Sequence, residues 1–269
     1  MPASEAYKFT NEDAENYDRY LGPVLFEPYG EYLASQIDTA NLSSVLELAS
    51  GTGRVTSHIY NALPAGTTLW ATDLSSDMLD IAKHRLSDVG IKYKTEDIQT
   101  LSFPDNSFDL VICQFGMMFL PDKQRGFDEI CRVLKPGGKL MCFTWDSTTN
   151  NPIFNLLINE LMLPYFEGED NTRLFVPFSL HDPQQLAGWL YKAGFASVSS
   201  EMVKLNSGTA SVEHTKTGFY LKHPLGKAVK DKGMDAFEEV GKKFEDAIAK
   251  RFGDPVSFPM SALLTIGVK

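Results

Sequence analysis

The sequence predicts an α/β fold in which helices flank a mostly parallel β-sheet. Three observations support this prediction. Short apolar runs, typical of buried strands, alternate with amphipathic helical stretches from residue 45 to residue 145. A Gly-x-Gly turn, Gly51 to Gly53, follows the first apolar run. Acidic residues follow the next two runs, at the end where open α/β sheets bind their ligands.

The first strand and helix lie in the stretch VLELASGTGRVT, residues 45–56. The apolar strand contains one acid, Glu47, and small residues follow it from Ala49 onward. Gly51 and Gly53 let the backbone approach a bound molecule with no Cβ in the way, and the helix behind them presents free N–H groups. The same pattern also fits a plain tight turn between a strand and a helix, because a lone glycine motif is weak evidence.

The second predicted strand, residues 67–73, ends in an acid. Asp73 stands 20 residues after Gly53, which is the separation at which a nucleotide-binding α/β fold places an acid on ribose hydroxyls. A carboxylate accepts hydrogen bonds from both vicinal hydroxyls. Asp73 also fits as the cap of the next helix, although Ser75 and Ser76 suit that role equally well.

The third and fourth predicted strands also end in polar residues. After the strand at residues 91–95 come Asp97 and Ile98, whose carboxylate and backbone N–H suit an exocyclic amine such as that of adenine; a surface aspartate is the commoner reading. Residues 108–113 form the most apolar strand. Gln114 and Phe115 follow it, so we expect them to border the reacting centre.

A helix that begins near Pro121 and a strand over residues 139–145 complete this alternation, with Pro136-Gly137-Gly138 ending the helix. The preceding helix is expected to run from about Met78 to Gly90.

The segments on either side of this central part are predicted to be mainly helical. Residues 1–40 hold amphipathic stretches with Tyr17 and Tyr20, either of which would touch a ligand if the segment closes as a lid; plain packing is the equal alternative. Residues 147–180 lose the strand–helix alternation and are rich in aromatic residues, so we interpret them as an inserted cap.

The remaining chain, residues 181–269, is expected to complete the sheet. Asp182, with proline after it, begins a helix, and strands follow at residues 198–205 and 260–268. A helical insert is expected at residues 206–257. The nucleotide-binding core is thus predicted to span residues 41–146.

Composition argues against several classes of function. The chain has 269 residues and a formal net charge of −10, and its lysines between 227 and 250 alternate with acids as on a solvated face, which disfavours nucleic acid as a partner. No apolar run is long enough to span a membrane, and no cysteine, histidine or acid set has metal-ligand spacing. Three cysteines in apolar contexts favour buried free thiols and a reducing, cytoplasmic location.

Taken together, the segments resemble the class I S-adenosylmethionine (SAM)-dependent methyltransferases, and within them the type 11 group that includes the ubiquinone and menaquinone C-methyltransferases. Four stretches carry the resemblance in the family's order: VLELASGTGRVT, ATDLSSDMLDIAK, EDIQTLSFPDNSFDLVICQFGMMF and LKPGGKLMCFTW. One departure is Ala49, which stands where many members have their first glycine; quinone methyltransferases often have alanine there too.

The resemblance implies a Rossmann-like sheet of seven strands in the order 3-2-1-4-5-7-6, with the last strand antiparallel. It implies SAM as cofactor and a small-molecule methyl acceptor. Glu47 and nearby backbone carbonyls would bind the cofactor's ammonium group, Asp73 its ribose, and Asp97 its adenine. With Tyr20 of the lid, the residues expected at the cofactor are Tyr20, Glu47, Ala49, Gly51, Gly53, Asp73, Leu74, Met78, Asp97, Ile98, Gln114 and Phe115.

The expected activity is in-line SN2 transfer of a methyl group to oxygen, carbon or nitrogen of a small, apolar or aromatic acceptor. The acceptor pocket would be lined by the aromatic residues Phe115, Trp145 and Phe154, whose rings would attract the sulfonium by cation–π interaction. Packing in the core explains these residues equally well. His181 is a weak candidate base. Two alternatives stay open: a SAM-binding protein without transfer activity, and an NAD-dependent oxidoreductase, which Thr56 in place of a third glycine disfavours.

Overall fold

The computed structural model describes residues 11–87 and 89–269. Its centre is one seven-stranded sheet in the order β3-β2-β1-β4-β5-β7-β6, and β7 runs antiparallel to both of its neighbours. The predicted strand order is therefore confirmed. The strands are β1 (Ser44–Leu48), β2 (Thr68–Asp73), β3 (Lys92–Thr95), β4 (Phe108–Gln114), β5 (Leu134–Trp145), β6 (Ser197–Asn206) and β7 (Pro259–Val268).

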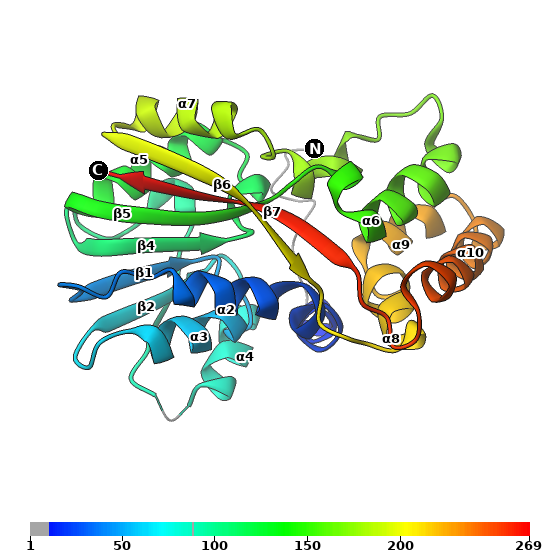
Figure 1. The fold of residues 1–269 in the computed structure, drawn as a ribbon, viewed down its shortest axis with the longest axis horizontal. Helices are drawn as coiled ribbons and strands as arrows, with labels where there is room; N and C mark the ends of the chain where they lie inside the picture. Colours follow the sequence, from blue (N-terminus) through cyan, green and yellow to red (C-terminus); the bar gives the residue numbers. More distant parts are fainter. Residues whose placement is uncertain (1–10, 88) are drawn as a thin grey trace.

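Helices cover both faces of the sheet (Figure 1). One face carries α2 (Glu27–Ser35), α3 (Arg54–Ala62) and α4 (Ser76–Arg85), and the other carries α5 (Lys123–Val133) and α7 (Pro183–Ala193). The side chain of Asp182 accepts a hydrogen bond from the N–H of Gln184 at 2.9 Å, so the predicted start of α7 is confirmed.

The helical elements of the two predicted insertions gather beyond the carboxyl end of β5, to the right of the sheet in Figure 1. The first supplies η5 (Thr148–Asn150), α6 (Pro152–Phe154), η6 (Asn155–Met162), η7 (Leu163–Phe166) and η8 (Thr172–Phe178), and the second α8 (Val212–Lys216), η9 (Thr217–Leu221), α9 (Pro224–Lys230) and α10 (Met234–Phe252).

The N-terminal segment is helical through α1 (Asn11–Asn16) and η2 (Tyr17–Phe26), and it leads directly into α2. The η2 element is π-helical: the N–H of Glu27 bonds to the carbonyl of Gly22, five residues back. Two short 3₁₀ turns, η3 (Ile98–Thr100) and η4 (Met117–Phe119), follow β3 and β4.

Two predicted boundaries were wrong. Helix α4 ends at Arg85 instead of continuing toward Gly90. Strand β5 begins at Leu134, so the Pro136-Gly137-Gly138 stretch lies inside the strand and does not end the helix. The reason is pairing at this end of the sheet: the N–H of Gly137 bonds to the carbonyl of Lys269 at 2.9 Å, and the N–H of Lys269 bonds to the carbonyl of Gly138 at 3.0 Å.

Cys113, Cys131 and Cys142 are buried free thiols, as predicted. Among the described residues, no helix is both long and apolar enough to cross a membrane.

The Asp109 carboxylate joins the beginnings of three neighbouring strands. Its Oδ2 accepts hydrogen bonds from the backbone N–H groups of Ser43 and Ser44, both at 2.9 Å, and its Oδ1 accepts from the Nζ of Lys135 at 2.7 Å. Partial burial alone would raise the pKa of Asp109, but the hydrogen bonds from Lys135, Ser43 and Ser44 outweigh it and hold that pKa well below its usual range.

Replacing Asp109 by alanine should lower the free energy of unfolding by about 2–3 kcal/mol at pH 7, since several charge-assisted hydrogen bonds are lost together. Because the folded state depresses this pKa, the contribution is complete above the unfolded-state pKa of about 4 and disappears as the pH falls further. Urea unfolding at pH 7 and below pH 4 measures both effects. As a control, Asp105→Asn breaks only an exposed ion pair to Arg132 and should change stability by less than about 1 kcal/mol. Equal effects of the two substitutions would contradict the assignment.

Candidate functional site

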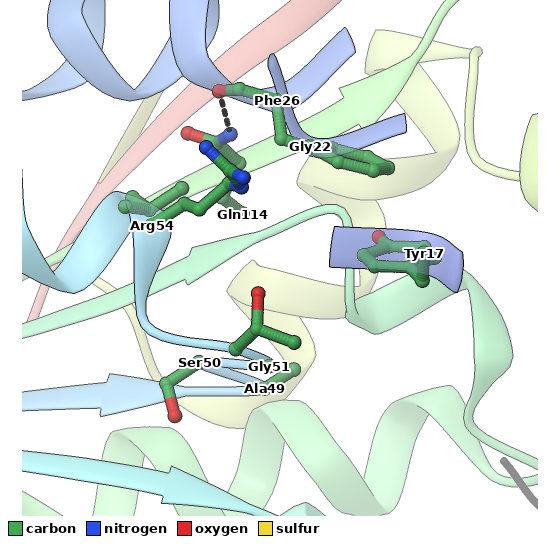
Figure 2. Close-up of a pocket in the computed structure, with 10 residues that line it drawn as sticks. Tyr17, Gly22, Phe26, Ala49, Ser50, Gly51, Arg54 and Gln114 are labelled. Carbon is green, nitrogen blue, oxygen red and sulfur yellow. Dashed lines mark hydrogen bonds between the residues drawn. The ribbon is translucent and has the colours of Figure 1, made fainter. Parts of the chain in front are cut away.

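A small pocket lies at the carboxyl ends of β1 and β4, under the N-terminal segment (Figure 2). It encloses about 40 Å³ of free space, whereas pockets for drug-sized ligands and cofactors usually measure several hundred Å³. The lining residues are Tyr17, Gly22, Phe26, Ala49, Ser50, Gly51, Thr52, Arg54, Val55 and Gln114.

The glycine turn and the acid at the end of β2 are in direct contact. The N–H of Gly51 donates to Oδ2 of Asp73 at 2.8 Å, and the N–H of Ser75 donates to Oδ1 at 2.9 Å. Burial raises the pKa of Asp73, although hydrogen bonds from Ser75 and Gly51 oppose the shift. Gly51 and Gly53 have positive φ values of 56° and 80°. Asp73 therefore holds the turn in shape, and its carboxylate contacts Gly51, which lines the pocket.

Ala49 adopts a left-handed conformation, with φ of 53°. This conformation is uncommon for a residue with a Cβ. The Cβ of Ala49 fits because residue 116 is glycine: a Cβ on Gly116 would lie 2.5 Å from it. The alanine at this position is thus matched by a glycine at the end of β4, which explains how the chain tolerates its departure from Gly-x-Gly-x-Gly.

Three buried polar atoms without a hydrogen-bond partner in the described part of the chain lie near this end of β1 and β4. They are Glu47 Oε2, Ser50 Oγ and Gln114 Oε1. Burial raises the pKa of Glu47 to about 8, the Thr56 hydroxyl lowers it, and the nearby Asp73 carboxylate adds to the rise. An unmet buried polar atom costs about 1–3 kcal/mol, so such a cluster favours a polar ligand that meets these atoms.

The N-terminal segment is fastened over the pocket by Asp18. This carboxylate accepts hydrogen bonds from Thr52 Oγ1 at 2.6 Å, Arg54 Nε at 2.9 Å and Arg85 Nη2 at 2.6 Å. Arg54 also donates to Glu27 Oε2 at 2.9 Å. The ion pairs therefore join η2 and α2 to the beginning of α3 and the end of α4.

Gln114 makes a second connection to the same segment. Its Nε2 donates to the backbone carbonyl of Phe26 at 2.9 Å, as Figure 2 shows. This bond fixes the orientation of the amide, because the reverse orientation would place two carbonyl oxygens together. Consequently, Oε1 is the buried atom of Gln114 that has no partner in the described chain.

Other residues expected at the cofactor lie beside the pocket, around the ends of β2 and β3. Leu74 is 67% exposed directly after Asp73, while Met78 and Ile98 are buried. Asp97 accepts from the N–H of Gln99 at 2.8 Å. The N–H of the preceding residue, Glu96, bonds to the carbonyl of Asp73 at 3.0 Å, so Asp73 and Asp97 follow neighbouring strand ends.

The aromatic residues expected in an acceptor pocket pack against one another. Phe115 has a left-handed backbone, with φ of 57°, and its ring stacks on Trp145 with centroids 4.0 Å apart. Phe154 contacts Trp145 at a ring distance of 6.1 Å. All three side chains are less than 8% exposed. None of them lines the small pocket, so their role toward an acceptor stays a prediction.

Tyr20 and the candidate histidines do not line the pocket. The ring of Tyr20 lies 4.9 Å from the ring of His214, whose Nε2 is 3.2 Å from the Tyr20 carbonyl. His181 is exposed, and its Nδ1 lies 2.7 Å from the Phe178 carbonyl. His223 caps α9 by accepting from the N–H of Leu225, and burial lowers the pKa of this histidine to about 4. The described residues hold no group of three or more histidines, cysteines or acids suited to a metal ion.

Sequence reasoning missed several residues of this site, and three of them are bound up with the N-terminal segment. Phe26, Arg54 and Asp18 all lie in or against the N-terminal segment. No sequence motif or hydrophobic periodicity marks Asp18 or Phe26 as residues of a binding site. The arginine directly after Gly53 was the only available indication, since a cation at the start of a helix opposes the helix dipole and calls for a partner.

Comparison with known proteins is consistent with this geometry. A family model described as a methyltransferase domain matches residues 46–142. A demethylmenaquinone methyltransferase from Lactiplantibacillus plantarum is 30% identical over 219 residues, which cover 74% of this chain and 90% of that protein. A ubiquinone/menaquinone biosynthesis C-methyltransferase UbiE from Laribacter hongkongensis is 31% identical over 181 residues, which cover 61% of this chain and 73% of that protein.

A solved structure extends the likeness to the whole fold. Phosphoethanolamine N-methyltransferase 2 from Haemonchus contortus, in complex with phosphomonomethylethanolamine and S-adenosylhomocysteine, matches with a TM-score of 0.62. The match covers 99% of this chain and 59% of that one at 16% identity, so it bears on the fold alone.

Proposed function

Because the chain belongs to the class I SAM-dependent methyltransferases, in the group of the ubiquinone and menaquinone C-methyltransferases, we propose that it methylates a ring carbon of a small reduced quinone. The enzyme uses SAM, which supplies an electrophilic methyl group on a sulfonium sulfur. The observation that carries the acceptor proposal is the 30% identity to a demethylmenaquinone methyltransferase over 90% of that relative. The aromatic-rich insertion beyond β5 agrees with an apolar, planar acceptor.

The buried polar atoms fit the cofactor's donors. SAM carries an ammonium group and two ribose hydroxyls, all of which donate hydrogen bonds. Glu47 and Gln114 each present an acceptor atom without a partner in the described chain, and we assign Glu47 to the ammonium. Asp73 keeps its carboxylate beside the glycine turn, where it would accept from the ribose hydroxyls. Leu74, Met78, Asp97 and Ile98 then surround the adenine end.

The residues of this site act chiefly by alignment. An in-line displacement needs the acceptor atom behind the methyl group, and holding reactants in that geometry is worth about 7–11 kcal/mol. The expected work of the chain is therefore to orient the two molecules and exclude water. His181 stays a weak candidate base, since its exposure and its contact with a backbone carbonyl give it no special position.

Transfer of labelled methyl from SAM tests the acceptor. The substrate is a 2-alkyl-1,4-naphthohydroquinone with a free ring carbon at position 3, kept reduced under anaerobic conditions. We expect label on that carbon. The 3-methyl hydroquinone is the matched control, because it blocks carbon methylation and leaves both hydroxyls. Label on the control's hydroxyls would indicate an O-methyltransferase, and transfer only to catechol or amine acceptors would exclude the quinone proposal.

We further propose that residues 11–26 form a lid over the cofactor. With about 40 Å³ of free space beneath it, the segment has to move outward before a cofactor enters. The Asp18 ion pairs are the contacts that such movement breaks. In this proposal Tyr17, not Tyr20, is the tyrosine that faces the cofactor, because Tyr17 lines the pocket.

Replacing Asp18 by asparagine should raise both the association and the dissociation rate constants for SAM by about tenfold, since a lost charge-assisted hydrogen bond corresponds to about 1.5–3 kcal/mol. The equilibrium affinity should change less than either rate. Stopped-flow fluorescence measures both. Asp80→Asn, which removes an exposed pair to Lys83 on α4, is the control and should change neither rate. Unchanged kinetics in Asp18→Asn would refute the lid role.

A further inference from the structure

Two aromatic rings on the N-terminal segment face the glycine turn. Tyr17 and Phe26 are the aromatic residues that line the pocket in the described chain, and they stand across it from Ala49 and Gly51 (Figure 2). Their rings stack with centroids 4.7 Å apart and planes inclined by 19°. Phe26 is held in turn through its carbonyl, which accepts from Gln114.

The rings first expected to face the cofactor pack against other rings in this structure. Phe115 and Trp145 stack face to face, with planes inclined by only 5°, and both are at most 5% exposed. Tyr29 packs edge-on against both of them, at ring distances of 5.4 and 5.5 Å. A ring surrounded by other rings offers no face to a ligand.

The lid side of the pocket attracts a cation through partial negative charges and not through a carboxylate. The face of an aromatic ring carries partial negative charge, and Gln114 Oε1 adds a carbonyl dipole in the same pocket. Burial, followed by the nearby Asp73 carboxylate, raises the pKa of Tyr17, so its ring stays neutral. A neutral, polarisable wall attracts a sulfonium but does not hold it as firmly as a carboxylate would.

We propose that Tyr17, supported by Phe26, is the wall against which the cofactor's sulfonium rests, so that the closed lid distinguishes SAM from its neutral product, S-adenosylhomocysteine. This inference rests on the proposed closure of the lid and is independent of the acceptor. Its consequence is directional: loss of the positive charge during transfer weakens the lid contact, so Tyr17 contributes less to binding of the product than to binding of SAM.

The test compares the dissociation constants of SAM and S-adenosylhomocysteine by isothermal titration calorimetry. Tyr17→Leu should lower the preference for SAM over S-adenosylhomocysteine by about 3- to 30-fold relative to the wild type, the range expected from a cation–π contact. Tyr17→Phe keeps the ring and should keep the preference. Phe26→Leu should reduce it by a smaller factor, and it provides the same comparison if Tyr17→Leu does not fold.

Tyr20→Leu is the matched control. Tyr20 lies on the same segment, but its ring contacts His214 and lies 5.8 Å from the Nζ of Lys222 instead of lining the pocket. This variant should weaken both ligands equally, if at all. Equal loss of affinity for SAM and S-adenosylhomocysteine in Tyr17→Leu would overturn the proposal and leave the ring a packing role. A change of preference in Tyr20→Leu as large as in Tyr17→Leu would overturn it as well.

Discussion

Replacing Asp73 by alanine is expected to weaken SAM binding by about 10- to 150-fold, the equivalent of 1.5–3 kcal/mol for a charge-assisted hydrogen bond. The loss has two sources. The carboxylate would no longer accept from the ribose hydroxyls, and the N–H of Gly51, now 2.8 Å from Oδ2, would lose its partner. Calorimetric titration with SAM measures the affinity directly.

Two variants separate these sources. Asp73→Asn retains one acceptor oxygen for Gly51 and should lose less affinity than Asp73→Ala. Asp97→Asn changes the neighbouring strand end and should have a smaller effect than Asp73→Ala, because a neutral amide oxygen still accepts from an amine. Affinity that is unchanged in Asp73→Ala would remove this residue from the site.

The second large effect concerns Glu47 and pH. Burial raises the pKa of this carboxyl to about 8, so it is mostly protonated at pH 7. A bound ammonium favours the carboxylate and therefore lowers that pKa, which means that SAM binding releases a proton. Affinity should consequently rise with pH, by up to about tenfold per unit below pH 8. Above about pH 8 the cofactor's own ammonium begins to deprotonate, and affinity should fall again.

Glu47→Gln should remove the pH dependence between pH 6 and 8 and weaken binding at pH 8. The same substitution should stabilise the ligand-free protein there. Because the folded pKa lies above the unfolded one, unfolding becomes easier as the pH rises from about 4.5 to 8, by up to about 4 kcal/mol. Calorimetry in buffers of different ionisation enthalpy detects the released proton, and urea unfolding gives the stability. Binding without proton release, in wild type and variant alike, would exclude Glu47 as the ammonium partner.

The two alternatives that the sequence left open lose their support. Membership of the methyltransferase family establishes SAM-dependent methyl transfer, and nothing observed favours a binding protein without activity. The NAD-dependent oxidoreductase alternative is disfavoured by the sheet, which has the seven-stranded order with an antiparallel β7 that the methyltransferase resemblance implied.

The error at the start of β5 arose from long-range pairing. The periodicity of residues 123–134 fits a helix, yet Leu134 already pairs with Phe108 in the sheet. Helical periodicity describes one segment at a time, while the start of β5 is decided by hydrogen bonds to β4 and to the chain's end.

The sequence by itself indicated the alternation of strands and helices, the glycine turn and the acid after the second strand, because strand periodicity, glycine position and the 20-residue spacing are local properties of the chain. The order of the strands in the sheet was implied only by the resemblance to the methyltransferase family. Only the tertiary structure decided which aromatic rings reach the pocket. The π-helical bonds of η2 widen the helix and turn Tyr17 and Tyr20 toward different neighbours, whereas a 3.6-residue period places them close together. The left-handed backbone of Phe115 likewise directs its ring onto Trp145, and no local pattern announces such a conformation in a residue other than glycine.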